Sequence, residues 1–237
     1  KDDLWDLIPK SIEKLDEESI LVITSKVISI SEGRCVKASN VDKDKLAIKE
    51  ADYYLPRDMV PGKWLMHTLT GNQLIASAGI DKSNGGSYFI LWPKDPQNSA
   101  KRIWEFLRKN YSVKNIGVVI TDSHTVPLHR GLVGMCIAFY GFVPLRDYRG
   151  KKDIFGEELL MSQANIPDAL ASAAVLEMGE GGEQTPLAII TDLKSKIKFI
   201  GEVPIPKQYD SFRVPIEEDL FYPFLKSVKW KKGSPRR

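Results

Sequence analysis

The chain has 237 residues, of which 27% are charged and 43% hydrophobic, and its two cysteines, Cys35 and Cys136, form no CxxC pair. This length suffices for a hydrophobic core, so neither a disulfide framework nor a zinc ribbon is needed for folding. Lysines and arginines number 34 against 31 acidic residues, and the longest uncharged run, 131–145, is shorter than the roughly 20 residues of a membrane-spanning helix. We therefore expect a cytoplasmic protein that binds neither membranes nor nucleic acid.

Several segments carry the apolar spacing of strands or helices. In chain order, they are a buried strand at 20–24, a hairpin of 64–70 and 73–78 around Gly71-Asn72, a helix at 100–109 capped by Ser99, a strand at 116–121, a helix from Pro167 to Gly179 and a strand at 186–191. These strands and helices do not alternate strictly, so the pattern predicts an α+β fold and not a doubly wound parallel sheet. Stretches with proline and glycine at 56–62 and 92–98 are the expected seams between two lobes of one unit that spans 1–237.

The final stretch, 226–237, contains six basic residues and no acidic residue. Charge runs of this kind are typical of a frayed, solvated tail, and this is the interpretation we favour. The alternative is a basic arm that binds nucleic acid.

Three acidic positions stand where side chains from different segments can meet. Asp81 lies just past the second hairpin strand, Asp122 with Ser123 follows the strand that ends at Thr121, and Glu180 follows the second helix. Acids at the carboxyl end of a helix are repelled by its dipole, so a cation is expected there. A set made only of oxygen ligands suits Mg²⁺ or Mn²⁺ and not zinc. From spacing alone, the alternative is a set of solvated surface acids.

The loop at 178–185 is rich in glycine, which lets backbone amides approach phosphates. No GxxxxGK[ST] sequence occurs and no GxGxxG follows a strand, which argues against P-loop ATPases and Rossmann dehydrogenases. An ordinary connecting loop is the alternative.

Basic and histidine residues between 124 and 152 are the remaining candidates. Anchors for an anionic substrate are Arg130, Arg146, Arg149, Lys151 and Lys152, with a solvated basic loop as the alternative. His124 and His129 have too few His or Cys neighbours for zinc. A triad of the adjacent residues 122–124 is disfavoured, because adjacent side chains rarely point at one another.

Taken together, these stretches resemble the coenzyme F-420:L-glutamate ligases, which add γ-linked glutamate to a deazaflavin precursor. The matching stretches, in family order, are SKVISISEGR at 25–34, AGIDKSN at 78–84, ITDS at 120–123, RG at 130–131, DYRG at 147–150 with Asp153 and FG at 155–156, and MGE at 178–180. No single stretch is specific, but the ordered set covers the chain from Asp2 to about Thr191.

The resemblance implies a role for each matching residue. Asp81, Asp122, Ser123 and Glu180 would hold two divalent ions, Mg²⁺ or Mn²⁺. Contacts to GTP (or ATP) would come from Ser25, Lys26, Asn84, Met178, Gly179, Gly181, Gly182, Glu183, Gln184 and Thr185. Arg130 and Arg149 become the candidate catalytic residues.

The resemblance also implies a two-lobed α+β unit, an intertwined homodimer and an amide ligation. In that reaction the acceptor carboxylate takes the γ-phosphoryl group, and the amine of L-glutamate attacks the acyl phosphate. A carboxylate is a poor electrophile until a phosphate leaving group is attached, and two metals would neutralise charge on the transferring group.

This chain departs from the family at positions that bear on the acceptor. Ile30 replaces a frequent lysine, while Val126 and His129 replace two arginines. Loss of two cations should weaken recognition of the phosphodiester F-420 precursor. The variant is similar to a branch proposed as folate-pathway γ-glutamate ligases, so a folate or pteroate acceptor is the alternative. A metal-dependent phosphohydrolase and a non-catalytic nucleotide- or RNA-binding module are the alternatives from other classes.

Overall fold

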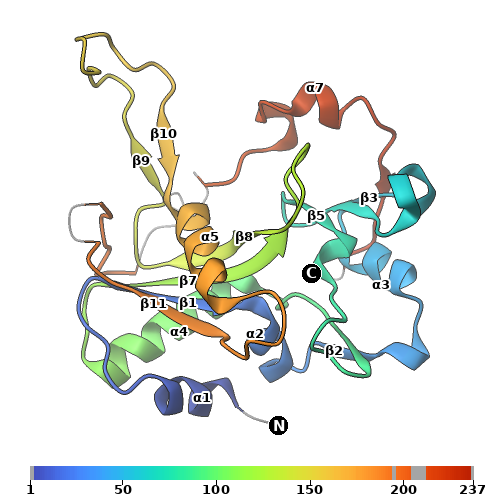
Figure 1. Cartoon of the computed structure of the whole chain (residues 1–237), viewed down its shortest axis with the longest axis horizontal. Helices are drawn as coiled ribbons and strands as arrows, with labels where there is room; N and C mark the ends of the chain where they lie inside the picture. The colour runs from blue at the N-terminus through green and yellow to red at the C-terminus, as the bar shows by residue number, and fades with distance from the viewer. Residues whose placement is uncertain (1–2, 194–195, 204–211, 236–237) are drawn as a thin grey trace.

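A four-stranded mixed sheet in the order β11-β1-β7-β8 lies at the centre of the computed structural model, which describes residues 3–193, 196–203 and 212–235 (Figure 1). Its strands are β1 (Ser19–Thr24), β7 (Ile116–His124), β8 (Val133–Tyr140) and β11 (Leu187–Ile190). β1 and β7 are parallel, with Ser19 opposite Ile116, whereas β11 and β8 are antiparallel to their neighbours. The two predicted buried strands, the third predicted strand at 186–191 and the α+β class are therefore confirmed.

Helices cover both faces of this sheet (Figure 1). α5 (Ile166–Met178) packs on one face, and α4 (Pro96–Tyr111) with α1 (Leu4–Ser11) packs on the other. Alternate residues of β1 enter the two cores, because successive side chains of a strand point to opposite faces. Leu21 packs with α4, and Ile20 packs with α5. Burial on both faces explains why β1 reads as a continuous apolar run.

A second four-stranded sheet, in the order β12-β3-β4-β5, lies beside the first. Its strands are β3 (Tyr53–Leu55), β4 (His67–Leu69), β5 (Leu74–Ala76) and β12 (Lys231–Lys232). The neighbouring helices are α2 (Ser25–Ser31) and α3 (Lys43–Glu50), and β2 (Cys35–Lys37) pairs with β6 (Tyr88–Ile90) in a separate two-stranded sheet. Short 3-10 helices are η1 (Ala38–Asn40), η2 (Arg57–Met59), η3 (Pro61–Lys63), η4 (Ser77–Gly79) and η5 (Ile216–Glu218). The predicted hairpin is confirmed with shorter strands, and both Gly71 and Asn72 adopt positive φ in its turn.

A long hairpin, which we call the arm (145–165), extends away from the body of the molecule (Figure 1). It begins with β9 (Leu145–Asp147) and returns through β10 (Gln163–Asn165) into α5. Backbone hydrogen bonds across the arm, such as Leu159 N–H to the Lys151 carbonyl, give it regular structure. Apolar side chains at its tip are nevertheless exposed, with Ile154 at 93% and Phe155 at 85%.

Two predictions made from local sequence are wrong. The helix predicted at 100–109 begins at Pro96, because the Asp95 side chain accepts the Asn98 N–H and so provides the cap in place of Ser99. The stretch 226–235 is not frayed, since β12 pairs with β3 and the Ser234 N–H donates to the Ile48 carbonyl. Residues 236–237 lie outside the described part of the chain, and α7 (Tyr222–Leu225) precedes this stretch.

None of the helices in the described ranges combines the length and the apolar character needed to cross a bilayer. The two-lobed arrangement and the homodimer stay predictions.

Candidate active site

Asp81 lies where the second sheet turns toward the first. η4 ends at Gly79, and Asp81 then forms a two-way backbone bridge with Ile90 at the end of β6. The Asp81 N–H donates to the Ile90 carbonyl at 2.9 Å, and the Ile90 N–H donates to the Asp81 carbonyl at 2.8 Å. This pair of bonds fixes the backbone from which the Asp81 carboxylate projects.

The Asp81 carboxylate is held by a cation from α2. Lys26 Nζ donates to Asp81 Oδ2 at 2.7 Å and to the Ser83 carbonyl at 2.9 Å, and the Ser83 N–H donates to Asp81 Oδ1 at 2.8 Å. Burial alone would raise the pKa of Asp81, but the hydrogen bonds from Lys26 and Ser83 outweigh it and lower that pKa below 3.8. Asp81 is therefore ionised at neutral pH.

Asp122 lies near the end of strand β7, and both of its carboxylate oxygens accept hydrogen bonds. The indole Nε1–H of Trp92 donates to Oδ2, and the Ser123 N–H donates to Oδ1 at 2.8 Å. Burial raises the pKa of Asp122 to about 6 against the effect of these bonds, and the nearby charge of Asp81 adds to the rise. A carboxylate in this state gains from a neighbouring cation.

Glu180 joins the group from the carboxyl end of α5. The helix ends at Met178, because Gly179 turns the chain at φ +79°. Glu180 Oε1 accepts a hydrogen bond from Ser123 Oγ at 2.6 Å. In the same loop, the Gly181 carbonyl accepts from Asn84 Nδ2 at 2.7 Å, and the Gly181 N–H donates to Glu183 Oε2 at 2.8 Å.

The structure thus brings together most residues that the sequence singled out. Asp81 and Asp122 interact electrostatically, Ser123 follows Asp122, and its hydroxyl reaches Glu180. Ser25 is buried at the start of α2 beside Lys26. The loop 178–185 meets this group through Asn84, with Gln184 at positive φ and Thr185 Oγ1 donating to the Glu183 carbonyl.

The two arginines predicted as catalytic residues lie in the arm and in the loop before β8. Arg149 follows β9 in the arm, where it pairs with Asp147 at 2.6 Å and lowers the pKa of that carboxyl to about 2. Arg130 is exposed in the loop before β8. The hydrogen bonds and ion pairs found among the described residues link neither arginine to Asp81, Asp122 or Glu180.

The donor atoms at this site are those that a hard divalent cation prefers, but they do not form a complete coordination shell. Its atoms are carboxylate and hydroxyl oxygens, which Mg²⁺ and Mn²⁺ prefer. In the ranges that the structure covers, no three His, Cys, Asp or Glu side chains are gathered to ligate one ion. Mg²⁺ commonly binds through one or two carboxylates and completes its sphere with phosphate and water oxygens. Asp81 and Asp122 fit that second type of site.

Sequence reasoning missed two residues at this site. Lys43 begins α3 and is half-buried; burial lowers its pKa, and its ammonium group interacts electrostatically with Asp81. Trp92 contributes the indole N–H that Asp122 accepts. Neither lies in one of the matching stretches, and both contacts join segments that are remote in the sequence, so no local pattern indicates them.

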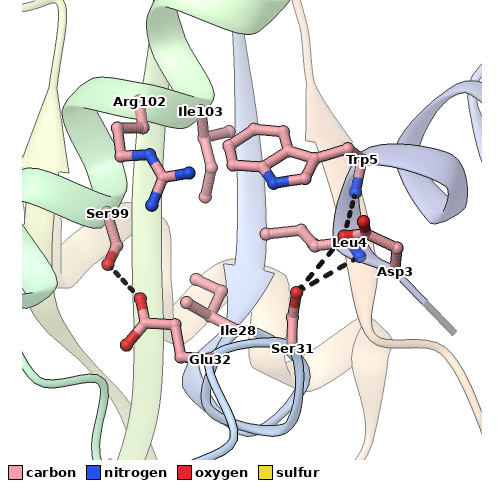
Figure 2. A pocket seen from close by; sticks show the side chains of 9 residues that line it. All are labelled: Asp3, Leu4, Trp5, Ile28, Ser31, Glu32, Ser99, Arg102 and Ile103. Carbon is pink, nitrogen blue, oxygen red and sulfur yellow. Dashed lines mark hydrogen bonds between the residues drawn. The ribbon is translucent and has the colours of Figure 1, made fainter. Parts of the chain in front are cut away.

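A cavity of about 240 Å³ lies at the other end of α2, between α1, α2 and α4 (Figure 2). Figure 2 shows Glu32 accepting from Ser99 Oγ on α4, whereas Ser31 turns toward Asp3 at the start of α1. A second cavity, of about 270 Å³, lies at the base of the arm beside Arg146. Neither cavity is lined by the three candidate carboxylates.

Comparison with known proteins gives a consistent result. Residues 1–192 match the model of the family described as F420-0:Gamma-glutamyl ligase. The coenzyme F420:L-glutamate ligase of Methanopyrus kandleri is 33% identical over 215 residues, covering 83% of each chain. The protein of that name from Methanosarcina barkeri is 31% identical over 229 residues, covering 88% of each chain. That of Methanocaldococcus jannaschii is 33% identical over 223 residues, covering 87% of this chain and 86% of the relative.

Proposed function

This chain belongs to the F420-0:γ-glutamyl ligase family, and we propose that it is a nucleotide- and divalent-metal-dependent ligase that joins L-glutamate to an acceptor carboxylate. One observation carries the proposal. Asp81, Asp122 and Glu180 come from segments that are far apart in the chain, yet the charge of Asp81 acts on Asp122, and Glu180 accepts a hydrogen bond from the hydroxyl of Ser123, the residue that follows Asp122. Acids scattered over the surface would not be expected to show these contacts.

The proposed reaction runs in two steps. An oxygen of the acceptor carboxylate attacks the γ-phosphorus of GTP or ATP, and the nucleoside diphosphate leaves. The amine of glutamate then attacks the acyl carbon, the amide bond forms, and phosphate leaves with the bonding electron pair. The net change is one nucleotide cleaved to its diphosphate and phosphate for each amide formed; the carboxylate oxygen leaves with the phosphate, and the amine loses a proton.

The residues divide this work by their chemistry. Asp81, Asp122, Ser123 and Glu180 would hold Mg²⁺ or Mn²⁺, which neutralises charge on the transferring phosphoryl group. Asn84 tethers the glycine-rich loop through the Gly181 carbonyl, so the loop is in place to meet the nucleotide. Lys26 neutralises Asp81 in the structure described here, and its ammonium also suits phosphate oxygens.

The acceptor of first choice is the F-420 precursor, which the relatives' names indicate. Val126 and His129 favour a second candidate, a folate or pteroate acceptor that lacks the phosphodiester. Val126 cannot bind an anion, and His129 Nδ1 lies 3.1 Å from the Pro127 carbonyl. If the family's arginines at these two positions recognise the phosphodiester, this chain lacks those cations.

We also propose that the arm forms the contact between two copies of the chain. Ile154 and Phe155 at its tip are exposed, as are Leu160 and Met161 at 74% each. Exposed apolar patches of this kind mark interfaces. The tip is flanked by lysines at 151–152 and glutamates at 157–158, and a surface with both charge signs can pair with itself across a twofold axis.

Sedimentation velocity tests this contact. Phe155→Ser should convert the dimer to a monomer, whereas Phe224→Ser, which changes an exposed phenylalanine on α7, should leave it dimeric. If both variants stay dimeric, the contact between the two copies lies elsewhere. If the wild type is a monomer, there is no such contact.

The reaction is tested by incubating the chain with GTP or ATP, Mn²⁺, glutamate and each acceptor. Mass spectrometry should detect an acceptor that has gained one glutamate, together with diphosphate release that depends on glutamate. Glu180→Gln should abolish both signals, whereas Glu177→Gln, one helical turn earlier and exposed, should keep them. Diphosphate release without glutamate would indicate a phosphohydrolase, and salt-sensitive RNA binding without turnover would indicate a binding module.

A further inference from the structure

Both candidate metal-binding aspartates are held by one short segment, Ile90–Trp92. Ile90 at the end of β6 bridges the Asp81 backbone in both directions. Two residues later, the Trp92 indole N–H donates to Asp122 Oδ2 at the end of β7. This segment therefore links Asp81, which follows η4, to Asp122 on strand β7 of the central sheet.

We propose that Trp92 is a positioning residue for the metal site, because its indole N–H holds the Asp122 carboxylate in the orientation that binds the cation. This inference rests on the proposed function, since it assigns Trp92 a role toward the metal of that reaction. Trp92 itself touches neither the ion nor the reacting atoms.

The indole is fixed on several sides, so it can impose an orientation. Trp92 is only 8% exposed and packs in the core on the α4 side of the sheet. Its backbone carbonyl accepts Arg34 Nε at 2.9 Å, and Arg34 in turn pairs with Glu50 at 2.5 Å. A donor held in this way loses little freedom when it bonds a carboxylate.

Gly79 makes the space that the indole occupies. A Cβ atom built at Gly79 would lie 2.1 Å from Trp92 Nε1 and 2.2 Å from Cε2, closer than real atoms approach. The five-membered ring of Trp92 is therefore wedged between the turn that precedes Asp81 and the Asp122 carboxylate. Any side chain at position 79 would push the indole away from its acceptor.

The hydrogen bonds at Asp122 leave lone pairs on both carboxylate oxygens. Oδ2 accepts one bond from Trp92 and Oδ1 accepts one from Ser123. Each oxygen of an ionised carboxylate has two lone pairs, so one remains on each for a cation. Loss of such an outer partner typically weakens metal affinity by about 10–100-fold.

Mn²⁺ binding to the full-length chain tests the proposal without turnover. Free Mn²⁺ is measured by electron paramagnetic resonance during titration, near pH 8. Trp92→Phe, which keeps an aromatic ring but removes the N–H, should weaken Mn²⁺ binding by about 10–100-fold. Trp104→Phe is the matched control, because its indole N–H also makes a buried bond, at 2.9 Å to the Ile116 carbonyl, away from the site.

Trp92→His separates the hydrogen bond from the bulk of the ring. The imidazole Nε2 is as many bonds from Cβ as the indole Nε1, so a neutral histidine can present an N–H at the same place. If the N–H is what matters, His binds Mn²⁺ more tightly than Phe. If Trp92 only fills the core, His, the smaller ring, is the worse of the two, and the proposal is overturned.

Asp122→Asn completes the test, because Trp92→Phe should have no further effect on Mn²⁺ affinity in that background. Wild-type affinity in Trp92→Phe would overturn the proposal. If Trp92→Phe does not fold, Gly79→Ala, whose Cβ would displace the indole from Asp122, takes its place, and wild-type Mn²⁺ affinity in that variant refutes the role of the contact. A wild type that ligates glutamate but binds no Mn²⁺ overturns this inference and the metal dependence of the proposed reaction, whereas Mn²⁺ binding without ligation overturns the proposed function and leaves this inference standing.

Discussion

Replacing Asp122 with asparagine should stabilise the folded chain at neutral pH while it abolishes ligation. Asp122 is a charged group in a poorly solvated position beside the negative charge of Asp81. Asparagine keeps the shape and can still accept the Trp92 N–H, but it carries no charge to desolvate and offers a weaker ligand to a cation. Function and stability are therefore expected to oppose one another at this residue.

The magnitude follows from the carboxyl group's titration. Burial raises the pKa of Asp122 from 3.8 to about 6. The folded state then binds the proton more tightly than the unfolded state, so the stability from this group is present below about pH 4 and is lost as the pH rises through 6. At about 1.4 kcal/mol for each pKa unit, the loss in the wild type approaches 3 kcal/mol at pH 7. The Asn amide cannot accept the Ser123 N–H, which costs about 1 kcal/mol.

Urea unfolding in EDTA at pH values from 4 to 7 measures the effect. At pH 7 the Asp122→Asn variant should be the more stable by about 2 kcal/mol, and near pH 4 the wild type should be slightly the more stable. Asp58→Asn, at an exposed position in η2, serves as the control and should show no crossover. A difference between wild type and Asp122→Asn that does not change with pH would refute the reasoning.

Three further outcomes follow from the same site. A pteroate acceptor should compete with the F-420 precursor in kcat/KM. The two charged hydrogen bonds lost with the arginines at positions 126 and 129 are worth about 1.5–3 kcal/mol each, which shifts the preference by powers of ten. A clear preference for the precursor would mean that Arg130 or another arginine supplies the charge. Asn84→Asp, which keeps positive φ but cannot donate, should raise the nucleotide KM and speed hydrogen exchange in the loop 178–185; unchanged exchange would contradict this role for the Gly181 contact. Lys43→Met should raise a substrate KM by about 10–100-fold, whereas Lys45→Met on the exposed side of α3 should not; equal effects would exclude a site role.

The parts of the fold that depend on local physics could be predicted from the sequence. β1 and β7 are apolar runs because both faces are buried, and α5 has Pro167 in its first turn and Gly179 past its end. The predicted cap of α4 is wrong because both Ser99 and Asp95 are residue types that cap helices. Asp95 is the cap in the structure, with Pro96 in the first turn, and the Ser99 hydroxyl donates to Glu32. β12 consists of two lysines, so its sequence indicates a solvated tail and contains no pattern that predicts a strand.

For the candidate site, the sequence indicates which carboxylates are candidates, but not which residues surround them. Asp81, Asp122 and Glu180 carry chemistry in their side chains and sit at the ends of predicted elements. Trp92 and Lys43 reach the site only because the second sheet packs beside the first, which no spacing within one segment indicates. The placement of Arg149 in a projecting arm depends on tertiary structure in the same way.

The strand order of the central sheet governs when the chain can fold as it leaves the ribosome. β1 must wait for β7 and then for β11, which lies beyond residue 186. At roughly 5–20 residues per second, that interval lasts on the order of 10–30 s, during which the nascent apolar strand β1 lacks at least one of its neighbours. Long-range parallel pairing is also slow in itself. Glu180 emerges only shortly before β11, so translation of most of the chain precedes the first moment at which the three candidate carboxylates can assemble.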